Sequence, residues 1–263
     1  MTLDLADDLA VALVLAAEAD LISIDRYRAQ DLDVQLKPDR SQVTDADTRV
    51  EKVIREHLAR ARPDDSILGE EFGTQGSSNR QWIIDPIDGT SNFVRGVPIW
   101  GALIALVVDG VPEVGVVSAP ALGRRWYAAT GHGAWLQQEG QEPRRLHVSG
   151  IADLAEASLS YNSLQLWDSY GRLDQLVDLS RVVSRTRAYG DLWSYMLVAE
   201  GAVDIAGEFD LKPWDIAALV PIVREAGGRV TDADGTENAL DTRSILATNG
   251  LLHDAVLERL RSR

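Results

Sequence analysis

The feature that most constrains the fold is a short apolar segment that runs directly into two carboxylates. Residues 82–84 read Trp-Ile-Ile, a pattern typical of a buried strand, and residues 85–90 read Asp-Pro-Ile-Asp-Gly-Thr. Burying a carboxylate without a partner is costly, so the group normally neutralises or finds a counter-ion. Two such groups at the end of one apolar strand therefore predict a bound cation.

Residues 85–90 also have the stereochemistry of an anion-binding turn. Pro86 fixes its own φ, and Asp88 followed by Gly89 permits a tight turn. Gly89 and Thr90 then present backbone N–H groups where a helix could start. We expect the carboxylates to face metal ions and the amides to face an anion. Because an apolar strand gains nothing from ending on paired acids, a functional interpretation is favoured over a structural one.

Three further acids stand at the ends of expected elements. Glu70 closes an earlier strand, Asp215 lies in the first turn of a helix, and Asp47 opens a helix as Thr-x-x-Asp. Taken singly, Asp215 and Asp47 read as helix caps and Glu70 as a solvated loop acid. Together with residues 85–90 they supply oxygen ligands only, which suit Mg²⁺ or Mn²⁺ rather than Zn²⁺.

The composition excludes several classes of protein. Cysteine is absent, which excludes disulfides, thiolate metal sites and a cysteine nucleophile and favours a cytoplasmic protein. The net charge of −15 opposes binding to nucleic acid or to an anionic membrane. No apolar run reaches the ~18 residues of a membrane span, and the acidic N-terminus does not have the pattern of a signal peptide. None of the four histidines falls in the acidic cluster, which argues against a histidine nucleophile.

The first half of the chain reads as two helices on a largely antiparallel sheet. Apolar side chains recur at helical spacing over residues 5–24 and again over residues 44–63. Residues 101–108 and 114–118 flank Asp109-Gly110, a sequence that favours a β-hairpin.

In the second half, short strands alternate with helices, one of which is expected at residues 216–226. This alternation is typical of a layered α/β architecture. We therefore divide the chain near residue 150. Residues 1–150 are expected to form an α+β lobe with most metal ligands and the phosphate turn. Residues 151–263 are expected to form an α/β lobe with Asp215 and the residues that select the substrate.

The motifs and their order resemble the inositol monophosphatase family of magnesium-dependent, lithium-sensitive phosphatases. The segments that carry the likeness are residues 69–71, 85–90 with Asn92-Phe93, 214–215 and 225–228. They are specific and span nearly the whole chain. The resemblance implies an α/β (α+β) fold, a five-layered αβαβα sandwich that is usually a homodimer.

The resemblance also implies a ligand for each metal ion. Glu70, Asp85 and the carbonyl of Ile87 would hold a first Mg²⁺. Asp85, Asp88 and Asp215 would hold a second, and a third, weaker ion would share Glu70. Two or three ions are thus expected in each active site, with Mn²⁺ as a substitute.

The remaining roles concern the phosphate and the attacking water. The amides of Gly89 and Thr90 would receive the phosphate, while the Thr90 hydroxyl, linked to Asp47, would orient the water. Glu70, Thr90 and Asp47 are therefore the expected catalytic residues. The implied reaction is metal-assisted, in-line hydrolysis of a small phosphate monoester without a phospho-enzyme.

Further segments resemble the actinobacterial histidinol-phosphate phosphatases within this family, which release L-histidinol in histidine biosynthesis. The segments are residues 95–100, 118–121 with 124–126, 187–191, 197–205 and 247–254. Histidinol phosphate carries an ammonium and an imidazole, both of which favour carboxylate partners. Asp191 and Glu208 are the candidates, with Asn249 for the imidazole. Ser91 stands where that subgroup is expected to have lysine.

Three other interpretations remain open. The enzyme could be an inositol-1-phosphate phosphatase or a broad sugar-phosphate phosphatase, with groups that match hydroxyls rather than charges. In another class, some bacterial relatives act as partners of the transcription machinery. The retained acidic constellation and the charge of −15 weigh against that reading. Structurally, Asp191 could cap the helix that follows it, and Glu208 could be a solvated loop acid.

Overall fold

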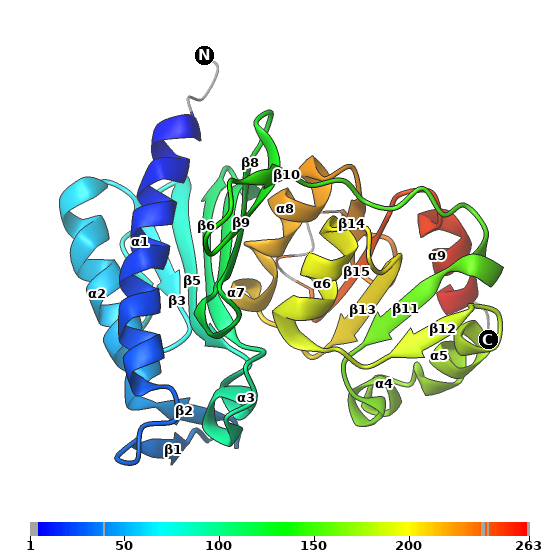
Figure 1. The fold of residues 1–263 in the computed structure, drawn as a ribbon, viewed down its shortest axis with the longest axis horizontal. Helices are drawn as coiled ribbons and strands as arrows, with labels where there is room; N and C mark the ends of the chain where they lie inside the picture. The colour runs from blue at the N-terminus through cyan, green and yellow to red at the C-terminus, as the bar shows by residue number, and fades with distance from the viewer. Residues whose placement is uncertain (1–4, 39, 238–239, 241, 262–263) are drawn as a thin grey trace.

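A computed structural model describes residues 5–38, 40–237, 240 and 242–261 of the chain. Across these residues, helices and sheets stack in five alternating layers, with helices on both outer faces and between the two sheets (Figure 1). The αβαβα sandwich and the α/β fold class expected from the resemblance are confirmed.

The first sheet has eight strands within the described residues and is covered on its outer face by α1 (Leu5–Arg26) and α2 (Asp45–Ala61). Its spatial order is β10-β9-β8-β7-β6-β5-β3-β4, and of the strand pairs only β3 and β5 run parallel. The strands are β3 (Ser66–Gly69), β4 (Gly73–Gln75), β5 (Arg80–Asp88), β6 (Gly101–Val108), β7 (Val111–Ala119), β8 (Arg124–Ala129), β9 (Gly133–Gln138) and β10 (Arg144–Arg145).

Both faces of this sheet are buried, which explains the continuous apolar sequence of its central strands. Side chains alternate across a strand, so Trp82 and Ile84 pack against α1 and α2 while Ile83 faces the middle helices. The hairpin between β6 and β7 turns at Asp109 and Gly110, whose φ angles of 51° and 79° are both positive, as expected for a two-residue turn.

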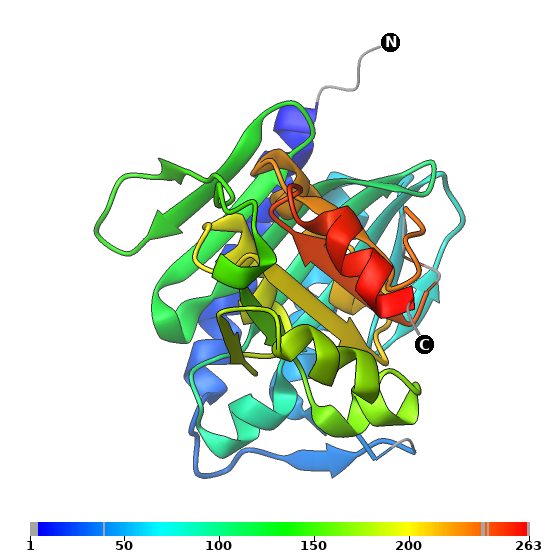
Figure 2. The ribbon, with the colours of Figure 1, turned by 90° about the vertical axis from the view of Figure 1, so that its right-hand side faces the viewer.

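The second sheet has five strands in the described part of the chain, in the order β12-β11-β13-β15-β14. They are β11 (Ser158–Tyr161), β12 (Arg185–Arg187), β13 (Ile205–Phe209), β14 (Arg229–Thr231) and β15 (Ser244–Thr248). The middle layer contains α6 (Asp191–Ala199), α7 (Pro213–Ile216) and α8 (Leu219–Glu225). The outer layer contains α4 (Leu164–Ser169), α5 (Leu173–Ser180) and α9 (His253–Arg261), which face the viewer in Figure 2.

Smaller elements complete one edge of the molecule. The short strands β1 (Val34–Leu36) and β2 (Gln42–Thr44) form a separate antiparallel pair beside α3 (Thr90–Arg95). Two 3₁₀ turns, Pro120–Leu122 and Leu154–Glu156, lie in connections.

The structure differs from the expected elements in the two segments that contain the aspartates of the predicted metal site. The helix expected at residues 216–226 is two helices, α7 and α8. Pro221 lacks a backbone N–H, so it would interrupt a single continuous helix. It is tolerated in the first turn of α8, where no intrahelical hydrogen bond is required of it. The strand expected at 82–84 extends to Asp88, and its pairing with β6 is irregular between Asp85 and Asp88.

The division of the chain near residue 150 separates the strands of the two sheets but not their cores. One cluster of buried side chains includes Leu103 of the first sheet, Met196 and Ile222 of the middle helices, and Ala247 of the second sheet. The middle helices therefore join both sheets into one packed unit. Among the described residues, no helix has the length and apolar character needed to cross a membrane.

Candidate metal centre and active site

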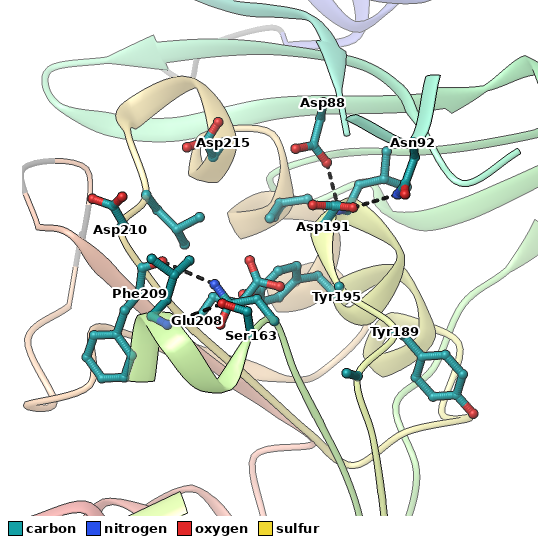
Figure 3. A pocket seen from close by; sticks show the side chains of 17 residues that line it. Asp88, Asn92, Ser163, Tyr189, Asp191, Tyr195, Glu208, Phe209, Asp210 and Asp215 are labelled. Carbon is teal, nitrogen blue, oxygen red and sulfur yellow. Dashed lines mark hydrogen bonds between the residues drawn. The ribbon is translucent and has the colours of Figure 1, made fainter. Parts of the chain in front are cut away.

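Three predicted ligands meet where β5 approaches the middle helix layer. Each of Asp85, Asp88 and Asp215 offers a carboxylate oxygen, and these oxygens all lie within 4.8 Å of one another. Asp85 and Asp88 lie at the end of β5, whereas Asp215 comes from α7, which is distant in the sequence but close in space. Figure 3 shows Asp88 and Asp215 facing the same pocket.

Each carboxylate is held by a backbone N–H that lies outside regular strand pairing. The N–H of Ile87 donates to Asp85 Oδ1 at 2.9 Å, and the N–H of Leu192 donates to Asp88 Oδ2 at 2.7 Å. Asp215 Oδ2 accepts from the N–H of Lys212 at 2.7 Å and so caps α7. The capping interpretation of Asp215 thus holds for one of its oxygens, and the group still reaches the acidic cluster.

The electrostatics of the cluster fit a hard divalent cation. Burial, followed by the charges of Glu70 and Asp88, raises the pKa of Asp85. Asp88 and Asp215 reach the pocket surface, yet the surrounding protein encloses them closely enough that burial raises the pKa of both, that of Asp215 to about 7. Clustered oxygen ligands that repel one another match the donor set of Mg²⁺ or Mn²⁺.

Glu70 belongs to the same electrostatic cluster but is engaged by a lysine. Its backbone N–H continues the β3–β5 pairing by donating to Ile84 O at 3.2 Å. Lys37 Nζ lies 2.7 Å from Glu70 Oε1 and 2.8 Å from Glu71 Oε1. Burial alone would lower the pKa of Lys37, but the two carboxylates raise it. A protein cation thus already neutralises one edge of the site, a contact that no sequence pattern indicated.

Asp47 and Thr90 lie side by side, as the resemblance implied. Thr90 Oγ1 lies 3.0 Å from Ile87 O and 3.5 Å from Asp47 Oδ1. The other oxygen of Asp47 accepts from Thr44 N at 2.9 Å and completes the capping box of α2. Burial raises the pKa of Asp47 to about 6. Asp47 therefore combines its capping role with a position beside the Thr90 hydroxyl.

The turn that begins α3 depends on a glycine. Gly89 has φ of 81°, and a Cβ at this position would lie 3.0 Å from Ile99 O. A larger residue would therefore be strained and crowded at the point where Gly89 and Thr90 are expected to receive phosphate.

Beside the cluster lies a cavity of about 450 Å³ whose lining includes Asp88, Asp191, Tyr195, Glu208 and Asp215. Figure 3 shows Glu208 and Tyr195 on the side of this pocket opposite Asp88 and Asp215. Glu208 is only 4% exposed, and its Oε1 atom and the Tyr195 hydroxyl have no hydrogen-bond partner of normal geometry among the described residues. Burial and the charges of Asp191 and Asp88 raise the pKa of Glu208.

Asp191 does not cap its own helix. The N–H of Leu192 is taken by Asp88, and Asp191 Oδ2 instead accepts from Asn92 Nδ2 at 2.9 Å. Asn92 Nδ2 also donates to Ile99 O at 2.8 Å. The Asn92 amide thus links α3 to Asp191 at the start of α6. The φ of Asp191 is 46°, an uncommon value for a residue other than glycine. Asn92 and Tyr195 were not predicted as site residues, although Asn92 lies two residues after the turn motif.

Of the three residues predicted to bind the substrate, Asp191 and Glu208 line this pocket and Asn249 does not. Its Nδ2 donates to Ser149 Oγ at 3.0 Å and to Ile151 O at 2.7 Å, and its Oδ1 accepts from Leu252 N at 3.2 Å. The amide is therefore used to tie loops around the end of β15, and the imidazole role expected for Asn249 is not supported.

The repulsion within the cluster predicts how pH and metal affect stability. Asp215 titrates at about 7 in the fold but at 3.8 when unperturbed, so between these values the folded state holds a proton that the unfolded state releases. Metal-free protein should therefore lose stability as pH rises through this window. We expect Asp215→Asn to raise the Tm of metal-free protein at about pH 8, since asparagine removes the charge and keeps an acceptor for Lys212 N–H.

Excess Mg²⁺ should raise the Tm of the wild type more than that of Asp215→Asn, because the variant has lost a ligand. Thermal unfolding with chelator and with MgCl₂ measures both effects. Asp65→Asn is the matched control: Asp65 pairs with Arg80 at 3.0 Å at the opposite end of β3, so its loss should lower Tm without altering the Mg²⁺ response. Equal Mg²⁺ stabilisation of the wild type and Asp215→Asn would contradict this account.

Comparison with known proteins identifies the family of this chain. The sequence model of the inositol monophosphatase family matches residues 4–263. A histidinol-phosphatase of Mycobacterium tuberculosis is 56% identical over 257 residues, covering 97% of this chain and 98% of that protein. A histidinol-phosphatase of Streptomyces coelicolor is 52% identical over 264 residues, covering 99% of each. The solved structure of the extragenic suppressor protein suhB of Bartonella henselae has a TM-score of 0.89 at 31% identity and covers 97% of this chain and 99% of that one. The chain belongs to the inositol monophosphatase family.

Proposed function

We propose that this protein is a magnesium-dependent phosphatase that hydrolyses L-histidinol phosphate to L-histidinol and phosphate. The observation that carries the proposal is the convergence of Asp85, Asp88 and Asp215, of which Asp88 and Asp215 line one wall of a pocket whose opposite wall contains Glu208. The two histidinol-phosphatase relatives, which match nearly the whole chain at more than half identity, support this choice of substrate.

Five groups would hold the metal ions. They are the carboxylates of Glu70, Asp85, Asp88 and Asp215 and the carbonyl of Ile87, with two or three Mg²⁺, or Mn²⁺, per site. Bound divalent ions supply positive charge that polarises the phosphoryl group and lowers the pKa of an attacking water.

The chain's own groups orient the reactants and accept the proton. The N–H groups of Gly89 and Thr90 hold phosphoryl oxygens where α3 begins. The Thr90 hydroxyl directs its hydrogen toward Ile87 O or Asp47 Oδ1, which leaves an oxygen lone pair to accept a hydrogen bond from the water. Asp47, with its pKa raised to about 6, is suited to receive the proton through Thr90 near neutral pH. Glu70 orients the same water from the metal side.

The opposite wall suits a leaving group that carries positive charge. Glu208 is buried beside the Tyr195 hydroxyl, and burial together with the charge of Asp191 raises the pKa of Glu208. An ammonium group from the substrate would relieve this repulsion, and charge pairs are stronger in an enclosed site than in water. Histidinol offers such an ammonium, whereas inositol offers only hydroxyls. Asp191 and Glu208 are therefore assigned to the substrate, and Asn249 is not.

The alternative substrate is inositol-1-phosphate or another small sugar phosphate. The same carboxylates and the Tyr195 hydroxyl can accept or donate hydrogen bonds to a polyol, which is the observation in its favour. On either reading the partner is a small phosphate monoester rather than nucleic acid or a membrane. We also propose, from the family resemblance, a homodimer located in the cytoplasm.

Phosphate release from a panel of monoesters tests the function directly. We expect Mg²⁺-dependent hydrolysis with kcat/KM for L-histidinol phosphate at least about 10-fold above that for inositol-1-phosphate, because only the former brings a charge to Glu208. Equal or better turnover of inositol-1-phosphate would sink the histidinol assignment, and release that is indifferent to chelator would sink the metal mechanism.

Asp88→Asn should lower kcat by at least about 100-fold with the fold intact, since the ligand loses its charge beside the leaving oxygen. Asparagine keeps an acceptor for the N–H of Leu192, so the start of α6 should be preserved. Steady-state kinetics together with circular dichroism measures both. Near-normal activity of the variant would show that Asp88 is not a ligand.

Glu208→Gln should raise KM for histidinol phosphate by about 10-fold or more and change KM for a neutral-alcohol phosphate little, because only the ammonium loses a charged partner. Asp210→Asn is the matched control, since Asp210 lines the same pocket but is already paired with Arg243. Parallel losses on both esters in Glu208→Gln would contradict recognition of the ammonium.

A further inference from the structure

Helix α2 directs a row of polar groups toward the active site. Asp47, Glu51 and Arg55 follow one another at intervals of four residues, which places them on one face of the helix. Asp47 reaches Thr90, as described above. Glu51 and Arg55 lie further along the helix and have no part in the proposed chemistry.

Glu51 is fully buried and binds the turn that follows β3. Its Oε2 accepts the backbone N–H of Glu71 at 2.7 Å, and its Oε1 accepts the N–H of Phe72 at 3.2 Å. Arg55 supplies the counter-ion, with Nε and Nη2 each 2.8 Å from Glu51 Oε1. Arg55 Nη2 also donates to Gly73 O. Glu51 thus binds the N–H groups of the turn, and Arg55 binds a carbonyl group of the same turn.

The turn is shaped around this carboxylate. A Cβ placed on Gly69 would lie 1.9 Å from Glu51 Oε1, so any other residue at position 69 would displace Glu51. Glu70 is the residue between Gly69 and the first N–H that Glu51 binds. Its own N–H is fixed by Ile84 O at 3.2 Å. The backbone of Glu70 is thus held on both sides by named hydrogen bonds.

Packing alone does not account for a charged pair at this position. Removing a carboxylate and a guanidinium from water is unfavourable, and well-packed apolar residues often serve stability as well or better. What a carboxylate provides here is two acceptors for adjacent backbone N–H groups, a geometry that an apolar side chain cannot supply.

We infer that Glu51, with Arg55 as its counter-ion, is a positioning residue that places the Glu70 carboxylate and thereby sets the affinity of the site for divalent cations. The inference rests on the role of Glu70 in the proposed function. Groups that orient metal ligands typically contribute about 10- to 100-fold to metal affinity or activity. Glu51 itself touches neither substrate nor metal.

Calorimetric titration of the full-length protein with Mn²⁺ alone tests the inference without any substrate. We expect Glu51→Gln to raise the Kd for Mn²⁺ by about 10-fold, because glutamine offers one acceptor where two N–H groups need partners. Gly69→Ala should weaken binding in the same direction by displacing Glu51. Arg55→Lys keeps the charge and should fold, with a smaller increase in Kd, and it carries the test if Glu51→Gln does not fold.

The matched control separates positioning from loss of stability. Asp65→Asn weakens a partly buried ion pair with Arg80 at the far end of β3 and should lower Tm while leaving the Mn²⁺ Kd unchanged. Saturating Mg²⁺ should restore kcat of Glu51→Gln to within about 3-fold of the wild type, as expected for a defect in ion binding.

Two results would overturn the inference alone: wild-type Mn²⁺ affinity in Glu51→Gln and Gly69→Ala while Asp215→Asn loses it, or equal weakening by Asp65→Asn. Failure of the wild type to bind Mn²⁺ and to require Mg²⁺ for hydrolysis would instead overturn the proposed function, and the inference with it.

Discussion

The repulsion among Asp85, Asp88 and Asp215 is the constraint on which the rest of the site depends. Their carboxylate oxygens lie within 4.8 Å of one another in a region enclosed by protein, where like charges are costly. The fold tolerates this because a backbone N–H binds each of them. Those hydrogen bonds fix the side chains but supply no full counter-charge, so the metal-free protein must take up protons or carry an unfavourable repulsion that a divalent cation would relieve.

One of these hydrogen bonds and a second polar contact nearby join the two halves of the chain. Asp88 caps α6 through Leu192 N, and Asn92 binds Asp191 across the pocket. The groups expected to bind phosphate and those expected to bind the leaving alcohol are therefore fixed relative to each other by short polar contacts rather than by packing alone. Catalytic geometry of this kind tolerates little displacement, and these ties connect the first sheet to the middle helices where the substrate would lie.

Features that depend on neighbouring residues were predictable from the sequence. The turn at residues 85–90, the capping box at Asp47 and the Asp109-Gly110 hairpin each follow from neighbouring residues, and each lies where expected. Contacts between distant segments were not predictable in the same way. Nothing near Glu51 or Lys37 in the sequence indicates that they hold the Glu70 turn, because their partners lie about 20 and 33 residues away. The contacts of Asn249 were not predictable for the same reason, because its amide binds Ser149 and Ile151, about 100 residues away in the sequence.

The distribution of charge explains how a chain of net charge −15 can bind an anion. The wall of the pocket that contains Asp88 and Asp215 is rich in carboxylates, which would require bound cations. Once those cations were bound, the local electrostatic field would attract a phosphate. The opposite wall offers the carboxylates of Asp191 and Glu208, and burial and neighbouring acids raise the pKa of Glu208, so a cation is needed to favour its ionised form. A substrate with a phosphate at one end and an ammonium at the other satisfies both walls at once. A neutral polyol phosphate satisfies only the first, and it must leave a buried carboxylate either uncompensated or protonated.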